Sequence, residues 1–161
     1  VEMAIRASET GHLVFGTLHT SSAPATMDRL LDVFPPNQQS QIRSMVAESL
    51  KAVICQQLVP NANKDGVVMA AEILLGTLAV SNLIREGKTF QIASTIQTSR
   101  NIGMSTMEQS YYDLFLAGKR SYEQTIPLIK TPDLINQMRT AEAQRLSEEA
   151  QKNAPKKKGW F

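Results

Sequence analysis

The chain has 161 residues, of which 42% are hydrophobic and 20% are charged, and its formal net charge is +2. This length suits one domain with its own core, and the composition is that of an ordinary soluble globular protein. No window holds the roughly 18 apolar residues of a membrane span. The charge is too small to indicate nucleic-acid binding. The single Cys55 excludes an internal disulfide and a multi-cysteine zinc module.

Residues 1–9 have the composition of a helix, but neither an N-cap residue nor an initiator methionine precedes them. We therefore expect the chain to be part of a longer protein.

The most informative pattern is the apolar run at residues 13–18, which follows Gly11 and His12 and stops at His19 and a cluster of hydroxyl residues. A short apolar run with such boundaries predicts a strand, over residues 12–19, that is buried on both faces of a sheet. Ligands of open α/β sheets bind beyond the carboxyl ends of the strands. We therefore expect His19 to lie at a ligand site, and His12, at the other end, to be structural.

The first half is predicted to mix helices with strands. Ser22 is placed to cap a helix over about residues 24–33, and Pro35 precedes another helix. Residues 67–75 are a second apolar run between two glycines, and they are predicted to be a strand. The helix after Pro35 is predicted to bury one face, formed by Ile42, Met45, Val46, Leu50, Val53, Ile54 and Leu58.

The second half is predicted to be helical. Thr77 starts a helix that ends near Gly87, and residues 89–99 form a further helical stretch. Ser105 and Glu108 have the spacing of a capping box, in which each side chain satisfies a backbone donor at a helix start.

Three parts follow from these patterns. Residues 1–76 are predicted to belong to an α/β core, and residues 77–140 to a small all-helical subdomain. Residues 141–161 are predicted to be a polar, flexible tail that ends in the basic run Lys156–Lys158 and two aromatic residues.

Two motifs resemble those of one family. Residues 9–20 (ETGHLVFGTLHT) look like the His box of secretion and pilus motor ATPases, and residues 23–34 continue the match. Residues 82–88 (NLIREGK) resemble a motif in the helical C-terminal region of the PilT twitching-motility subfamily. The pairs Gln97-Thr98 and Gly103-Met104 agree with it as well.

The resemblance implies the C-terminal portion of a RecA-like ATPase core followed by a helical subdomain. It also implies a homo-hexameric ring in the cytoplasm, at the inner face of the cytoplasmic membrane and only peripherally associated with it. ATP and Mg²⁺ are the implied cofactors and an inner-membrane pilus platform protein the implied partner, with no nucleic acid. Extension and type II secretion relatives usually carry a four-cysteine metal module, and residues 56–66 contain no cysteine. The sequence is thus assigned to the retraction ATPases of this family and not to the extension or secretion ATPases.

Carried over to this chain, the resemblance makes His19 the catalytic sensor of the γ-phosphate. Thr17, Thr20 and Arg29 join His19 as cofactor-binding residues. Without the resemblance, alternatives stay open. His19 could be a histidine at a strand end whose hydrogen bonds are made within the fold, and Arg29 could form a local ion pair with an aspartate of its helix.

The second motif implies that Arg85, Glu86 and Lys88 couple ring motion to the pilus machinery. The alternative is a solvated helix end, where Arg85 and Lys88 would suit the helix dipole.

No phosphate-binding loop of the form G-x-x-x-x-G-K-S/T is present, since the nearest approach, at Gly87-Lys88-Thr89, has Asn82 at the first position. We expect the phosphate-binding loop and the Mg²⁺ ligands to lie upstream of Val1, and we expect no metal site within this chain. We therefore predict that this chain alone does not hydrolyse ATP. Two rival functions remain: an assembly or type II secretion ATPase that lacks its zinc module, and a non-catalytic interaction module.

Overall fold

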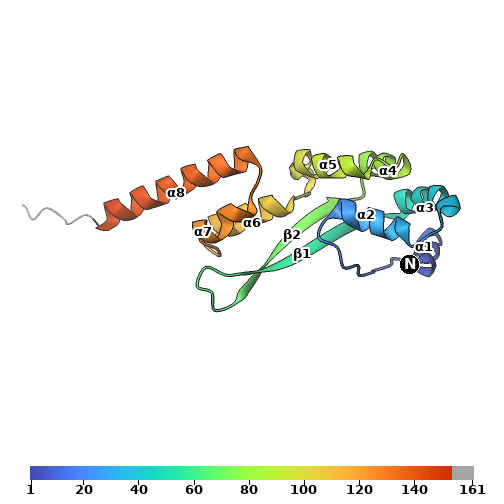
Figure 1. Cartoon of the computed structure of the whole chain (residues 1–161), viewed down its shortest axis with the longest axis horizontal. Coiled ribbons are helices and arrows are strands. Elements are labelled where there is room, and N and C mark those ends of the chain that lie inside the picture. The colour runs from blue at the N-terminus through green and yellow to red at the C-terminus, as the bar shows by residue number, and fades with distance from the viewer. Residues whose placement is uncertain (154–161) are drawn as a thin grey trace, which may run out of the picture. The chain divides into compact units, whose positions relative to one another are not determined.

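The computed structural model describes residues 1–153, which comprise helices and one two-stranded sheet (Figure 1). They divide into two compact units. Unit 1 contains Val1–Val59 and Met69–Ser110, and unit 2 contains Pro60–Val68 and the chain from Tyr111 onward.

Unit 1 contains five α-helices, and two of their starts follow the predicted caps. The Ser22 hydroxyl accepts the backbone N–H of Ala25 at 3.4 Å, and the Thr77 hydroxyl accepts that of Val80 at 3.4 Å. Both helix starts are thereby confirmed. The helices are α1 (Glu2–Glu9), α2 (Ala23–Asp32), α3 (Pro36–Ser49), α4 (Leu78–Arg85) and α5 (Ile92–Thr98), with short 3₁₀ turns η1 (Thr89–Gln91) and η2 (Arg100–Ile102).

The sheet is a hairpin of β1 (Ala52–Pro60) and β2 (Val67–Leu75), whose strands run antiparallel (Figure 1). The predicted strand over 67–75 is confirmed, but the prediction that the preceding helix continues to residue 58 is wrong. In β1 Val53 and Cys55 are buried while Ile54 and Leu58 are exposed, which is the period of a strand. A short apolar run fits both periods, and pairing with β2 decides in favour of the strand.

Residues 12–19 have no regular secondary structure and belong to no sheet of the described chain. Leu13 is 74% exposed and Phe15 is 88% exposed, so this segment is not buried on both faces as predicted. A strand is defined by ladder hydrogen bonds to a neighbour, and no neighbouring strand pairs with these residues within residues 1–153.

One core holds unit 1 together. It is formed by apolar side chains of α1, α2, α3, β1, β2, α4 and α5, together with Phe34 and Met104. Its largest fully buried side chains are Met27, Leu74, Val80, Ile84, Ile92, Ile96 and Met104.

The helix α6 (Met107–Leu116) is capped differently from the prediction. The Thr106 hydroxyl accepts the backbone N–H of Gln109 at 3.1 Å, so Thr106 and not Ser105 is the cap. Ser105 instead pairs its backbone with Ile73 of β2, at 3.1 and 2.8 Å. This long-range bridge is invisible in a local sequence pattern, and it removes Ser105 from the helix start.

Unit 2 packs around Phe115, Ile129 and Met138. It contains α7 (Tyr122–Thr125), the 3₁₀ turn η3 (Ile126–Leu128) and α8 (Pro132–Asn153). Residues 141–153, predicted to belong to a flexible tail, continue α8, and the rest of that predicted tail lies outside the described residues. Although α8 has 22 residues, no helix within residues 1–153 combines such a length with the apolar composition that a membrane crossing requires.

Candidate functional site

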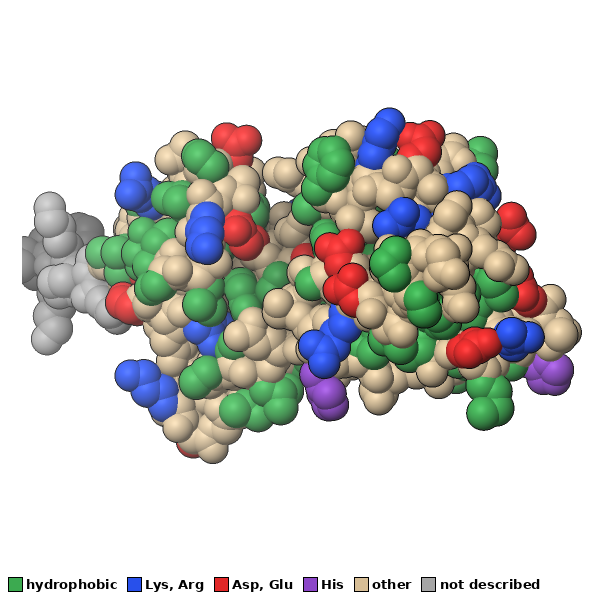
Figure 2. All heavy atoms as spheres, turned by 45° about the vertical axis from the view of Figure 1, so that its right-hand side comes forward, with side chains coloured by type: hydrophobic (Ala, Val, Ile, Leu, Met, Phe, Trp, Pro, Cys, Tyr) green, Lys and Arg blue, Asp and Glu red, His purple; other side chains and the backbone are tan. Residues whose placement is uncertain are grey.

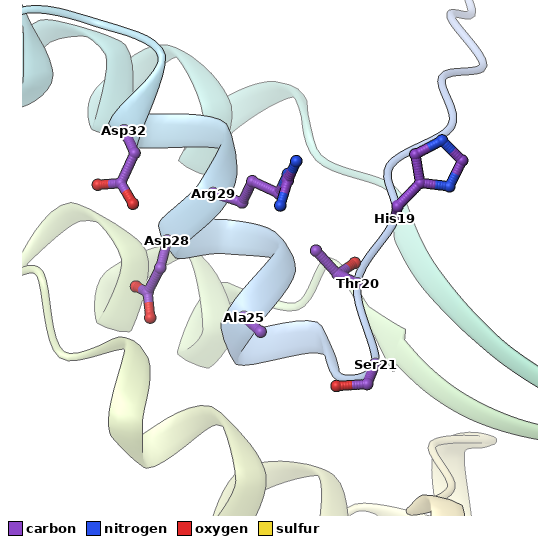
Figure 3. Close-up of a pocket in the computed structure, with 7 residues that line it drawn as sticks. All are labelled: His19, Thr20, Ser21, Ala25, Asp28, Arg29 and Asp32. Carbon is purple, nitrogen blue, oxygen red and sulfur yellow. The ribbon is translucent and has the colours of Figure 1, made fainter.

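An open depression lies where the segment before α2 meets that helix (Figure 3). Its lining contains three of the predicted site residues, His19, Thr20 and Arg29. The other lining residues are Ser21, Ala25, Asp28 and Asp32.

The N-terminus of α2 is held from two sides. Ser22 caps it from its own chain, and the Ala23 N–H donates to the Oε1 atom of Glu72, on β2, at 2.7 Å. A carboxylate at a helix N-terminus is also favoured by the helix dipole. Because these contacts already use the first N–H groups of α2, the helix end itself is not available to a phosphate.

Thr20 is tied to the same helix. Its hydroxyl shares a hydrogen bond of 2.7 Å with the Thr26 hydroxyl, which donates to the Ser22 carbonyl at 2.8 Å. The Thr26 hydroxyl also lies 3.6 Å from the Cys55 thiol, whose pKa is raised chiefly by burial. These hydrogen bonds hold Thr20, the residue after His19, against the first turn of α2.

His19 and Arg29 are both exposed, and neither has a hydrogen-bond or ion-pair partner in the described chain. Figure 3 shows Arg29 extending toward the side on which His19 lies, while Asp28 and Asp32 point to the other side of α2. The local ion pair that the sequence offered as an alternative for Arg29 is thus not formed among residues 1–153. Thr17 is exposed and does not line the depression.

One contact that the sequence did not predict joins α2 to a part of the chain outside the depression. The Thr89 hydroxyl donates to the Oδ1 atom of Asp28 at 2.8 Å, which joins α2 to the turn after α4. The two residues are 61 positions apart, so no local pattern could have revealed the bond.

That turn carries the predicted coupling residues, which lie outside the depression. Lys88 pairs with Glu86 at 2.8 Å, and this hydrogen bond and charge lower the pKa of Glu86. Arg85 donates to Asn82 at 3.0 Å and lies 3.9 Å from Glu48 of α3. All three coupling residues are exposed, so they form a surface and not a pocket.

Two donor side chains of the depression have no partner within residues 1–153. The imidazole of His19 and the guanidinium of Arg29 carry N–H groups of the kind that suits phosphate oxygens, whereas the single hydroxyl hydrogen of Thr20 is donated to Thr26. The carboxylates of Asp28 and Asp32 also belong to the lining. Within residues 1–153, no group of three or more His, Cys, Asp or Glu residues is arranged to hold a metal ion.

Comparison with known proteins connects this chain to one family. Residues 1–153 match the family described as Type II/IV secretion system protein. A type IV pilus retraction ATPase, PilT of Pseudomonas aeruginosa, is 46% identical over 133 residues, which are 83% of this chain and 38% of that protein. A twitching motility protein of Neisseria gonorrhoeae is 50% identical over 118 residues, 73% of this chain and 32% of that protein. The chain thus spans between 32% and 38% of the length of these curated relatives.

A solved structure agrees with the sequence match. The crystal structure of the pilus retraction motor PilT with bound ADP superposes with a TM-score of 0.70 at 40% identity, and covers 84% of this chain and 38% of that one. The predicted fold class, the C-terminal part of an α/β ATPase core with a helical subdomain, is confirmed by this match.

Proposed function

The chain belongs to the family of type II/IV secretion system proteins, and from this membership we propose that it is part of a motor ATPase that couples ATP hydrolysis to type IV pilus retraction in twitching motility. The observation that carries the proposal is the high identity to two proteins of pilus retraction and twitching over most of this chain.

The contribution of this chain to ATP binding would come from the depression. His19 and Arg29, without partners in the described chain, would donate to the terminal phosphate, and Thr20 would hold His19 in place through its bond to Thr26. ATP, when bound, would supply the phosphoanhydride bond whose hydrolysis drives movement. The phosphate-binding loop and the Mg²⁺ ligands are proposed to lie outside this chain, because it contains no such loop.

The surface of Arg85, Glu86 and Lys88 is proposed to transmit the motion to an inner-membrane platform protein. The bond between Thr89 and Asp28 supports this assignment, because it ties the turn to the helix that lines the depression. We further propose a cytoplasmic homo-hexamer, attached peripherally at the inner face of the membrane.

The complete protein provides the test. It should hydrolyse ATP, and deleting its gene should leave surface pili that no longer retract. A strain without pili would instead indicate an assembly or secretion ATPase. A complete protein that hydrolyses no ATP would indicate a non-catalytic interaction module.

A further inference from the structure

Arg43, on α3, is a half-buried guanidinium without a partner. Its Nε atom is fully buried and has no hydrogen-bond acceptor, and no ion pair or hydrogen bond of this side chain occurs within residues 1–153. A buried donor without an acceptor is unfavourable, so each such group in a native protein calls for an explanation.

The packing shows what holds the guanidinium in place. Gly87, in the turn after α4, has a φ of +70°, and a Cβ atom built there would lie 3.5 Å from Nη1 and 3.6 Å from Cζ of Arg43. The Arg43 side chain thus lies against the bare backbone of the turn that separates Glu86 from Lys88. Contacts with a rigid turn hold this side chain, and no carboxylate does.

The nearby carboxylates are already engaged. Glu86 pairs with Lys88, and Glu48 lies beside Arg85. Among the three cations at this place, Arg43, Arg85 and Lys88, only Arg43 lies within 4.0 Å of no carboxylate oxygen in the described chain. We name these three residues the basic surface.

We propose that the basic surface binds an acidic segment of a partner protein and that the Arg43 guanidinium receives one of its carboxylates, an inference that rests on the function proposed above. A planar guanidinium fits a carboxylate through two parallel N–H donors, here those of Nη1 and Nη2, because the Nε atom is fully buried and out of a partner's reach. Holding the guanidinium in advance lowers the entropy lost on binding.

The charges of the surroundings favour a protein over a lipid membrane. Glu48 and Glu86 are exposed beside the three cations, so the whole group carries a net charge of only +1. On the face shown in Figure 2, basic and acidic side chains likewise lie next to one another. With a net charge of only +1, such a mixed surface gains little attraction from a uniformly anionic layer, but it selects a segment whose charges have a matching order.

The test reverses the charge of Arg43 in the complete protein. Arg43→Glu should leave ATP hydrolysis unchanged and lower twitching at least about tenfold. Arg43→Lys should lose less, since it keeps the charge but not the paired donors. Arg139→Glu, at an exposed position of α8, is the charge-matched control and should twitch normally. Arg43→Gln repeats the test without a new charge, with the melting temperature measured alongside.

Suppressors of Arg43→Glu then identify the occupant. Substitutions of Asp or Glu by Lys or Arg in another protein would support the proposal. Suppressors in this chain would show that copies of the protein contact one another here, and would overturn it. Normal twitching of Arg43→Glu and Arg43→Gln, or loss of ATP hydrolysis together with twitching in a folded variant, would overturn it as well. Failure of the function proposed above would show separately, in the unmodified protein, as absent ATP hydrolysis.

Discussion

His19 lies exposed in the segment before α2 and has no hydrogen-bond or ion-pair partner within residues 1–153, whereas Arg120, in unit 2, is only 4% exposed. The Arg120 guanidinium donates to the Pro60 carbonyl at 2.7 Å, to the Gln124 carbonyl at 2.6 Å and to the Thr125 hydroxyl at 3.4 Å. Burial lowers the pKa of Arg120, and the charge interaction with the nearby Tyr111 partly offsets this effect.

The contrast separates two uses of a polar side chain. Arg120 joins the end of the hairpin to the start of α7, so its donors are used within the fold. The donors of His19 remain available to a ligand. Hydrogen bonds made inside the protein thus distinguish a group that stabilises the fold from one that serves a site.

The largest effect on stability is expected at Arg120. Arg120→Met removes the donors and leaves two carbonyls without partners, so the free energy of unfolding should fall by about 3 kcal/mol. Urea denaturation followed by circular dichroism would measure it, with Arg139→Met at an exposed position as the control. A change equal to that of the control would show that the bonds of Arg120 contribute nothing and would break the contrast.

For His19 we expect the opposite pattern, a large effect on ATP hydrolysis and none on stability. In the complete protein, His19→Ala should lower the rate of ATP hydrolysis about a hundredfold, because it removes a donor to the terminal phosphate. Its melting temperature should not change, because the imidazole makes no contact that the fold needs. His12→Ala, at the other exposed histidine, is the matched control. Equal rates for His19→Ala and the unmodified protein would contradict the assignment.

Thr106 and Ser105, two adjacent residues at the start of α6, test whether the side chain that makes the internal hydrogen bond is the one that stabilises the fold. Thr106→Ala should cost about 1 kcal/mol of stability, because it removes the acceptor for the Gln109 N–H. Ser105→Ala should cost less, since Ser105 contributes to the bridge with Ile73 through its backbone. Thermal unfolding of both variants would decide, and a larger loss for Ser105→Ala would restore the sequence-predicted cap.

The smallest effect concerns Cys55, which lies beneath the start of α2. Burial raises the pKa of its thiol, so the folded protein binds its proton more tightly than the unfolded chain does. The resulting stability is complete below the ordinary thiol pKa of about 8.5 and is lost as the pH rises toward the folded-state pKa. Urea titrations between neutral and alkaline pH should show a steeper loss for the unmodified protein than for Cys55→Ala. Parallel curves would contradict this.

Much of unit 1 could be predicted because its signals are local. Ser22 and Thr77 cap helices through residues three positions away, and the run at 67–75 shows its strand boundaries directly. The motif around His19 likewise lies in one continuous segment. His19, Thr20 and Arg29 could therefore be named from the sequence, and the structure places them around one depression.

What the sequence by itself determined is thus the family motifs and the starts of α2 and α4, because each depends on neighbours along the chain. Only the tertiary structure decided that residues 53–58 are a strand, that Ser105 bridges to Ile73 and that Asp28 meets Thr89. It also showed that Arg43 has no hydrogen-bond or ion-pair partner among residues 1–153. These features depend on groups that are far apart in sequence and meet only when the chain has folded, so no local period or spacing encodes them.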